Sequence, residues 1–543
     1  MVKVNRIWAA AVAICMLLAF APVNVFAQGT GGACGDGVNW SYDDGQLKIT
    51  GTGDMKSYTE SSKAPWYRYS DYIVSVSIEP GVTSIGDYAF FWCDALTSVT
   101  IPDSVTSIGG YAFSDCKNIE SITIPNGVRS IGDGAFNNCS SLKSVTISGS
   151  VESIGDSAFS SCDALTSITI PDGVKSIGEY AFYWCEQLGD VTLPDSITSI
   201  GVNAFYKTAY YNDDSEWDVL YIGHHLIAVN QNMSGTYNIA FGTKTIADSA
   251  FYYCNQLKSI TIPKSVESIG NRAFDSCNDL SSITIPKSVE RIGDYAFYTC
   301  YDLASINVDP ENNAYCDENG VLYNKEKTEI IRFPKEKTDT SFIIPNSAEK
   351  IAAGAFEYCY KLTAITIPDS VTSIGDYAFS DCGALISAVI PDGVTSIGDK
   401  AFYACSGLKS VTIPNSVESI GGYAFSGCNR LKEVNYIGSK TDWAAIEKGE
   451  KYSISESIIN YCMGLSAVRI SDGKVVARPI NIENGKTVIV AFYDGDKFIE
   501  MQSKAYNGTE ITFETNKTYT CAKAMVWDSL DSVSPVCKAK TVK

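Results

Sequence analysis

Cysteine is the residue whose type and spacing could carry chemistry in this chain. There are 18 cysteines, and most follow the phenylalanine of a recurring Ala-Phe pair by three residues. Thiols at a fixed spacing could form disulfides, hold a metal ion or pack as small apolar groups. The cysteines in this slot are Cys93, Cys116, Cys139, Cys162, Cys185, Cys254, Cys277, Cys300, Cys359, Cys382, Cys405 and Cys428.

The spacing argues against disulfides in this slot. Equivalent side chains of stacked repeats point the same way, with Cβ atoms about 4.8 Å apart, whereas a disulfide needs about 3.8 Å. One copy carries Thr208 in the slot, and threonine can replace a small packing residue but not half of a disulfide. We therefore predict a ladder of buried free thiols. Cys521 and Cys537, near the C-terminus, are better candidates for a disulfide.

The remaining chemistry-bearing residues do not form a catalytic or metal motif. The only two histidines, His224 and His225, are adjacent, so a strand would point them to opposite faces, and we predict turn or surface residues. No C-x-x-C pair, G-x-S-x-G motif or phosphate loop is present. A carboxylate pair could still cleave glycosides, but repeat acids such as Asp103 fit turn positions after proline. We predict no enzyme, no cofactor and no metal site.

A repeat of 23 residues positions these side chains. Leu96–Cys116 reads LTSVTIPDSVTSIGGYAFSDC, and Leu165–Cys185 reads LTSITIPDGVKSIGEYAFYWC. In residues 99–101 apolar residues alternate with threonine, which predicts a short strand that Pro102 ends. Apolar residues spaced by one and three from Ala112 to Ile119 predict a short helical turn.

One copy buries too few side chains to fold alone, so copies must stack into one continuous core. The sequence therefore predicts a repeat solenoid, mainly β with short helical turns, over residues 81–432. Its repeat phenylalanines are Phe90, Phe113, Phe136, Phe159, Phe182, Phe205, Phe251, Phe274, Phe297, Phe356, Phe379, Phe402 and Phe425.

The ends of the array need caps, because terminal coils would otherwise expose core and strand edges. We predict an N-terminal cap over 28–80, with a hairpin that buries Trp40, Leu47 and Ile49 and turns at Asp44-Gly45. Residues 433–462 should close the other end. The expected core residues there are Tyr436, Trp443, Ile446 and Ile458.

Three segments depart from the repeat. Residues of about 209–241 and 308–344 interrupt its period, each with a Val-Leu-Tyr triplet, and we predict hairpin-bearing long repeats. They could project a contact surface or be tolerated insertions. Residues 463–543 predict a small β-sandwich module, which could bind a glycan or the cell wall or act as a spacer.

The first residues predict export. Lys3 and Arg6 precede an apolar run from Trp8 to Phe20, and Val25-Phe26-Ala27 fits a signal-peptidase site. We expect a signal peptide over 1–27, cleaved after Ala27, and a secreted, extracellular or cell-surface protein with no membrane insertion after cleavage. The net charge of −20 repels phosphate backbones, so we expect no nucleic-acid partner.

Aromatic residues cluster just after the repeat phenylalanine, where other copies carry Ser, Asn or Asp. Aromatic side chains are common contact residues at interfaces and on sugars. They could instead pack between coils. The candidate partner-binding residues are Phe91, Trp92, Tyr183, Trp184, Tyr206, Tyr252, Tyr253, Tyr298, Tyr301, Tyr358, Tyr360 and Tyr403.

The repeat resembles the leucine-rich repeat. Leu96, Val99 and Ile101 match its L-x-x-L-x-L half, whereas Ser104-Val105 stands where Asn/Cys-x-Leu is usual. This departure and the IP, SIG and AF signatures resemble the BspA-like subfamily over residues 34–462. The resemblance implies a surface or secreted protein that adheres to host matrix proteins or other cells. A protein partner of this kind is therefore expected, and the alternatives are glycan binding, which would assist polysaccharide capture, and a structural surface spacer.

Overall fold

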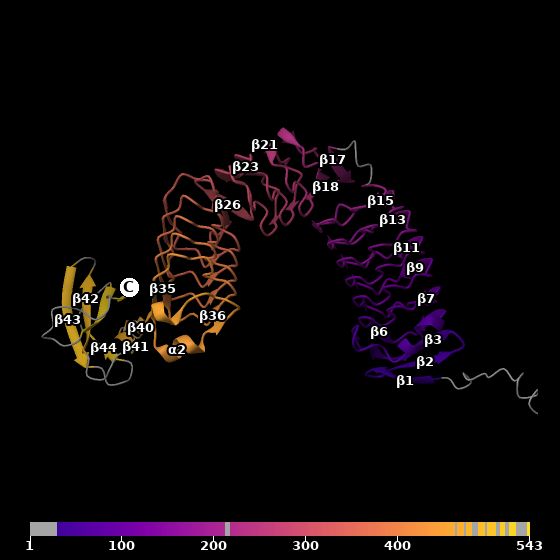
Figure 1. Cartoon of the computed structure of the whole chain (residues 1–543), viewed down its shortest axis with the longest axis horizontal. Helices are drawn as coiled ribbons and strands as arrows, with labels where there is room; N and C mark the ends of the chain where they lie inside the picture. The colour runs from indigo at the N-terminus through magenta and orange to yellow at the C-terminus, as the bar shows by residue number, and fades with distance from the viewer. Residues whose placement is uncertain are drawn as a thin grey trace, which may run out of the picture. The chain divides into compact units, whose positions relative to one another are not determined.

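The structure is a computed structural model of the chain. It describes residues 30–211, 218–461, 464–471, 474–480, 487–494, 497–505, 511–515, 521–527 and 540–542. The predicted signal peptide and its cleavage site, like Cys537 of the candidate disulfide, lie outside the described residues. The chain divides into two compact units, Met1–Trp217 and Asp218–Lys543, and the stacked coils of each can be followed in Figure 1. None of the described helices is long and apolar enough to cross a membrane.

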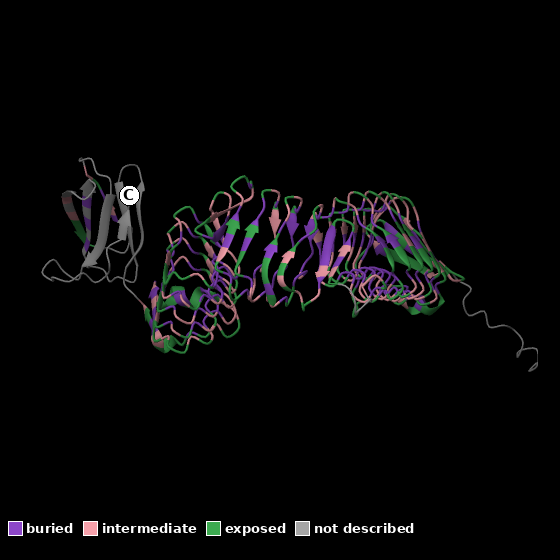
Figure 2. Ribbon diagram, turned by 90° about the horizontal axis from the view of Figure 1, so that it is seen from above, coloured by how far each residue is buried: buried purple, intermediate pink, exposed green. Residues whose placement is uncertain are grey.

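Each coil of unit 1 contributes two short strands that pair in parallel with their equivalents 23 residues away. One side of the coils carries the Ser-Val-Thr and Ser-Ile-Thr segments, in which exposed residues alternate with buried or partly buried ones. Figure 2 colours the coils by burial. These strands pair within three sheets: β5 (Ser75–Ile78) with β7 (Ser98–Thr100), β9 (Ser121–Ile124) with β11 (Ser144–Ile147), and β13 (Ser167–Thr169) with β15 (Asp190–Thr192).

The second ladder is built from the Ser-Ile pairs and forms one seven-stranded parallel sheet. Its isoleucines are buried in every strand from β6 to β16. The strands are β4 (Gly53–Asp54), β6 (Val82–Ile85), β8 (Ser107–Ile108), β10 (Ser130–Ile131), β12 (Ser153–Ile154), β14 (Ser176–Ile177) and β16 (Ser199–Ile200).

The third side of each coil corrects one prediction, because it consists of backbone turns and contains no helical turn. The Cys116 N–H donates to the Phe113 carbonyl at 3.3 Å and closes a turn inside the coil, whereas the Phe113 N–H donates to Ala135 of the next coil at 2.8 Å. Tyr111 and Asp115 have φ of 53° and 60°, which a right-handed helix does not contain. A helical turn and a series of backbone turns both bury residues at spacings of one and three, so the sequence pattern could not distinguish between them.

The core of each coil stack is a column of phenylalanine rings with a thiol ladder beside it. Phe136 stacks on Phe113 and on Phe159, each at 5.3 Å between ring centroids. The Cys139 thiol donates to the Phe113 carbonyl at 3.2 Å, and burial raises its pKa to about 12. The twelve repeat cysteines are free thiols, which confirms the predicted ladder. Thr208 instead donates to a carbonyl of its own coil.

The N-terminal end closes as the sequence predicts. β2 (Val38–Asp43) and β3 (Gln46–Gly51) form the hairpin that turns at Asp44-Gly45, and β1 (Thr30–Gly35) adds a strand that was not predicted. Trp40, Leu47 and Ile49 are buried. A 3₁₀ helix, η1 (Tyr67–Tyr72), follows Trp66, which stacks on Phe90 at 5.7 Å and donates to the Ala89 carbonyl at 2.8 Å. The first repeat phenylalanine is thereby covered.

Each interruption carries a hairpin, as predicted, and both hairpins lie in unit 2. β17 (Val219–Ile222) and β18 (His225–Val229) form the first, and β26 (Tyr315–Glu318), β27 (Val321–Asn324) and β28 (Glu329–Arg332) form the second. His224 is exposed at the first turn, but His225 is fully buried in β18, so its prediction as a turn or surface residue was wrong. The strand faces the core at this position because it replaces a repeat strand.

The Ser-Ile ladder of unit 2 is broken at the second interruption. A five-stranded sheet ends at β24, and an eight-stranded sheet begins at β26. The ladder strands are β20 (Thr245–Ile246), β22 (Ser268–Ile269), β24 (Arg291–Ile292), β30 (Lys350–Ile351), β32 (Ser373–Ile374), β34 (Ser396–Ile397), β36 (Ser419–Ile420) and β38 (Glu447–Lys448). The strands on the opposite side form four sheets: β19 (Ser234–Asn238) with β21 (Gln256–Thr261), β23 (Ser282–Ile285) with β25 (Ser305–Val308), β29 (Ser341–Ile343) with β31 (Ala364–Thr366), and a four-stranded sheet of β33 (Ser387–Val389), β35 (Ser410–Pro414), β37 (Glu433–Ile437) and β39 (Ile459–Tyr461).

The C-terminal coils end on α2 (Lys440–Ala445) and the 3₁₀ helix η2 (Glu456–Ile458). Ser439 and Asp442 form a capping box at the start of α2, and its Trp443 packs against Tyr436 at 5.1 Å. Tyr436, Trp443 and Ile446 are buried, as expected of a cap, and Ile458 is partly buried.

Two antiparallel sheets follow this end. One contains β40 (Gly464–Ser471), β41 (Lys474–Ile480) and β44 (Ile511–Phe513), and the other contains β42 (Thr487–Asp494), β43 (Lys497–Ala505), β45 (Cys521–Trp527) and β46 (Lys540–Val542). The β-sandwich itself and the domain boundaries remain predictions.

Candidate interaction surface

The predicted aromatic residues lie on the turn side of the coils. Residues two positions after the repeat phenylalanine take left-handed backbone angles, with φ of 60° at Trp92 and 58° at Trp184. Their N–H groups donate to the next coil, at 3.0 Å and 2.9 Å, which fixes the backbone and leaves the side chains outside. Trp92, Trp184, Tyr252, Tyr253, Tyr301, Tyr360 and Tyr403 are exposed, and Phe91, Tyr183, Tyr206, Tyr298 and Tyr358 are partly buried.

The first cluster of unit 1 surrounds Trp92, and we call it the Trp92 patch: Lys63, Tyr67, Tyr88, Phe91, Trp92 and Tyr111. Phe91 and Trp92 stack with centroids 5.4 Å apart and planes at 9°. The Lys63 ammonium lies 4.7 Å from the Phe91 centroid and 4.6 Å from that of Tyr67. The patch therefore combines flat apolar faces with one positive charge.

The second cluster of unit 1 repeats this arrangement, and we call it the Trp184 patch: Tyr180, Tyr183, Trp184, Tyr206, Lys207 and Tyr211. Tyr183 stacks on Trp184 at 5.9 Å and on Tyr206 of the next coil at 5.8 Å. Lys207 lies 5.6 Å from the Tyr206 centroid. A lysine again accompanies stacked rings.

The two tryptophans occupy the same position in coils four repeats apart, and their exposed fractions are 48% and 47%. Asp115, Asn138 and Ser161 hold this position in the three coils between them. Neighbouring strands lie about 4.8 Å apart, so the two tryptophans are on the order of 20 Å apart along the stack. Unit 1 thus presents two aromatic patches separated by a polar strip.

Four of the predicted aromatic residues of unit 2 gather near one lysine at the second interruption. Lys335 lies 4.4 Å from the Tyr358 centroid, 4.7 Å from that of Tyr301 and 5.7 Å from that of Tyr298. Tyr360 packs against Tyr358 at 5.8 Å. The interruption therefore brings together four of the predicted residues, which we call the Lys335 patch.

Charged groups are buried beneath the Lys335 patch. Arg332, Lys335 and Glu357 are at most 6% exposed. Arg332 donates to the carbonyls of Gly354 and Glu357, but within the described residues Lys335 Nζ and Glu357 Oε2 have no hydrogen-bond partner. Burial lowers the pKa of Lys335 to about 7, with a contribution from Arg332, and raises the pKa of Glu357 to about 7.

The remaining predicted residues do not join these clusters. Tyr252 and Tyr253 pack edge-on with centroids 4.5 Å apart. Tyr403 makes no ring contact with another predicted residue in the part of the chain that the structure describes.

Sequence reasoning missed the tyrosines two residues before the repeat phenylalanine. Tyr88, Tyr111 and Tyr180 belong to the unit 1 patches, and Tyr88 stacks on Tyr111 at 5.0 Å. The recurring Tyr-Ala-Phe triplet is the signal that could have found them. Arg332-Phe333-Pro334-Lys335 stands where other coils carry Ala-Phe and two further residues, and it marks the coil that buries Lys335.

The described residues place no three His, Cys, Asp or Glu side chains where they could hold a metal ion.

The family of the chain follows from its repeats. The pattern described as the BspA type leucine rich repeat region (6 copies) matches residues 64–172, 152–233, 229–339 and 332–445, which is more than half of the chain. The chain belongs to this family. Among curated proteins no relative matches it.

Solved structures of bacterial repeat proteins also match the chain. A leucine rich cell surface protein from Faecalibacterium prausnitzii is 28% identical, over 77% of this chain and 97% of that one, with a TM-score of 0.37. A leucine-rich repeat protein from Eubacterium ventriosum is 25% identical, over 78% and 85%, with a TM-score of 0.29. The pneumococcal vaccine antigen PcpA is 18% identical, over 79% and 96%, with a TM-score of 0.33.

Proposed function

We propose that this protein is exported and binds other proteins at or near the bacterial surface through the aromatic patches of its coils, as an adhesion or recognition protein. The observation that carries the proposal is the equivalence of Trp92 and Trp184. Each is about half exposed, stacks on its aromatic neighbour and stands at the same repeat position.

The patches have the properties of binding hot spots. Tryptophan and tyrosine supply large contact areas and dominate measured interface energies. Stacking against Phe91 and Tyr183 holds the two tryptophans in place before a partner arrives, which lowers the entropy lost on binding. A partner that contacts both patches of unit 1 gains avidity, because the second contact forms at high effective concentration.

Variants copied from neighbouring coils test the proposal. Ser161 occupies the position of Trp184 with the same left-handed backbone, so Trp92→Ser and Trp184→Ser are expected to leave the fold intact. The full chain and both variants would be measured against immobilised matrix proteins and mucins by surface plasmon resonance. We expect each replacement to weaken binding about tenfold or more, and the double replacement to remove the avidity.

Ser161→Ala is the matched control, because it changes the same repeat position in a coil without an aromatic patch. Its affinity should equal that of the unchanged chain. Unaltered affinity of both tryptophan variants, with circular dichroism showing intact folding, would reject the aromatic patches as the contact surface. Binding to a glycan panel without binding to any protein would favour polysaccharide capture, and binding to neither would favour a spacer.

A further inference from the structure

The strongest feature outside the exposed patches is a cavity of about 310 Å³ at the break in the Ser-Ile ladder of unit 2. It lies where the coil of β24 meets the second interruption. Among the residues that line it are Glu290, Asp294, Tyr295, Tyr315, Asn324 and Arg332. Tyr298 also lines it, so the cavity lies beside the Lys335 patch.

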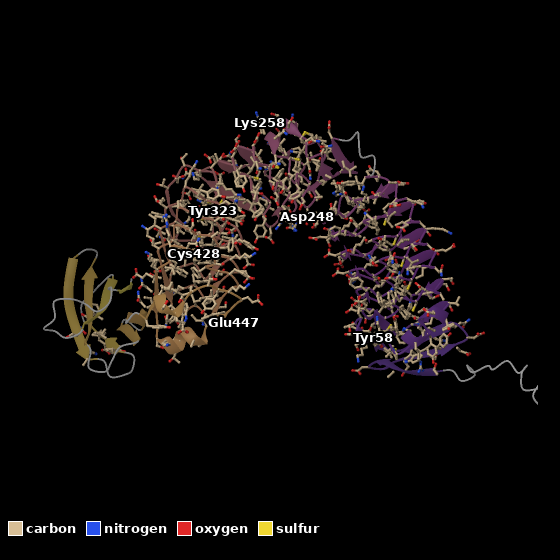
Figure 3. All side chains as sticks on the ribbon, viewed as in Figure 1. Tyr58, Asp248, Lys258, Tyr323, Cys428 and Glu447 are labelled. Carbon is tan, nitrogen blue, oxygen red and sulfur yellow. The ribbon has the colours of Figure 1, made fainter. Side chains whose placement is uncertain are left out.

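The cavity follows from the loss of the repeat. The bond to the preceding coil is kept here, because the Gly293 N–H donates to the Ile269 carbonyl at 2.8 Å, as Gly132 does to Ile108 in a regular coil. At the break, the Ile292 N–H donates to the Tyr315 hydroxyl at 2.8 Å, so a side chain stands where a ladder strand would otherwise pair. Tyr323 of β27, labelled in Figure 3, is buried in this interruption. The hairpin therefore fills the core but leaves the space beside β24 open.

One unpaired donor lies at this cavity. Arg332 is 6% exposed, and its Nε has no hydrogen-bond partner among the described residues. A buried unsatisfied donor costs about 1–3 kcal/mol, so a ligand that accepts a hydrogen bond from it gains affinity.

Hydrogen-bond acceptors and aromatic side chains also line the cavity. The carboxylates of Glu290 and Asp294 belong to exposed residues on the lining. Tyr295 and Tyr315 add aromatic side chains to the lining. Asn324 is already occupied, because it donates to Thr328 and accepts from the Glu329 N–H, so it shapes the wall and is not free to bind.

We propose that this cavity binds one unit of a neutral sugar. Sugar hydroxyls both donate and accept, which matches the Arg332 guanidinium and the carboxylates of Glu290 and Asp294 on one lining, and tyrosine rings suit the apolar face of a sugar ring. A free anion would meet the carboxylates of Glu290 and Asp294, and a cation would meet Arg332. The volume lies at the lower end of the range of about 300–1,000 Å³ for ligand pockets, which suits a single unit.

The proposal adds a small-molecule site to the protein-binding surface of unit 1. The full chain would be titrated with methyl glycosides of glucose, galactose, mannose and N-acetylglucosamine by saturation-transfer NMR and calorimetry. Glucuronate and spermidine serve as charged probes. We expect saturable binding of at least one neutral glycoside and weaker or no binding of the charged probes.

Substitutions in the cavity lining test whether a bound glycoside occupies the cavity. Ala353→Phe places a ring in the lining and is expected to weaken binding at least tenfold. Glu290→Ala removes one exposed acceptor and should weaken it about tenfold. Glu418→Ala is the matched control, because Glu418 holds the same repeat position beside an unbroken ladder. If Ala353→Phe lowers the unfolding midpoint, Asp294→Asn replaces it.

Absence of saturable binding by every neutral glycoside overturns the proposal, and so does stronger binding of glucuronate or spermidine. Glycoside affinity that is the same in the cavity variants and the control also overturns it. Trp92→Ser should leave glycoside binding unchanged, so failure of the sugar site and failure of the protein-binding patches give different results.

Discussion

The regular coils of unit 1 and the second interruption of unit 2 solve the same packing problem differently. From β8 to β16 the coils repeat, and a buried thiol such as Cys139 meets a carbonyl of the previous coil. At residues 308–344 the repeat fails, and Arg332, Lys335 and Glu357 are buried with atoms that lack partners among the described residues. In the regular coils each buried thiol finds a carbonyl in the preceding coil, because the coils are equivalent. The interruption instead buries charged side chains and leaves a cavity.

The largest expected effect breaks the regular side of this comparison. Phe136→Ala removes a fully buried ring that stacks on both neighbours, and we expect a loss of about 3–5 kcal/mol in the free energy of unfolding. Urea unfolding of the full chain, followed by circular dichroism, would measure it. Phe241→Ala is the control, because Phe241 is 91% exposed and should change stability by less than about 0.5 kcal/mol. Equal losses of unfolding free energy for both variants would contradict a stabilising role of the stacked phenylalanines.

The next effect concerns the interruption and depends on pH. Burial raises the pKa of Glu357 to about 7, so between pH 4.5 and 7 the folded chain binds more protons than the unfolded chain. Its contribution to stability is therefore lost as pH rises through this window, by at most about 1.4 kcal/mol per pH unit. Glu357→Gln should remove this loss, as thermal unfolding at a series of pH values would show.

Lys335 should act in the opposite direction at higher pH. Burial lowers its pKa to about 7, so between pH 7 and 10.5 the unfolded chain binds more protons, and stability rises with pH. Lys335→Met should flatten this rise. Glu152→Gln, in an exposed ion pair with Arg129, is the control and should leave both slopes nearly unchanged. Identical pH profiles for Glu357→Gln and the unchanged chain would show that this cluster is not buried as described.

The regular part of the molecule could be predicted closely from sequence because its signals repeat. The strand at residues 99–101, the proline that ends it and the thiol slot recur in the same order, so chance patterns are excluded. The turn side could not be assigned correctly, because Ala112, Phe113 and Cys116 fit a helical turn and a series of backbone turns equally well. Left-handed angles at Tyr111 and Asp115 leave no signature in residue type.

The candidate site was only partly predictable. Exposed aromatics were found because they replace Ser, Asn or Asp at a fixed position, and Trp92 and Trp184 are the clearest cases. The burial of Lys335 and Glu357 and the cavity beside β24 depend on how residues 308–344 fold across the stack, which a single irregular segment does not reveal. The burial of His225 was missed because residues 209–241 are likewise a single irregular segment.

The smallest expected effect tests how much the thiol ladder contributes. Cys139→Ala removes a buried sulfur and its weak bond to Phe113, and we expect a loss of about 1 kcal/mol. Cys428, which is only partly buried, should lose less when changed to alanine. The urea midpoints of both variants would measure this difference. A loss several times larger for Cys139→Ala would mean that the thiol–carbonyl ladder itself, and not the phenylalanine column, holds the regular coils in register.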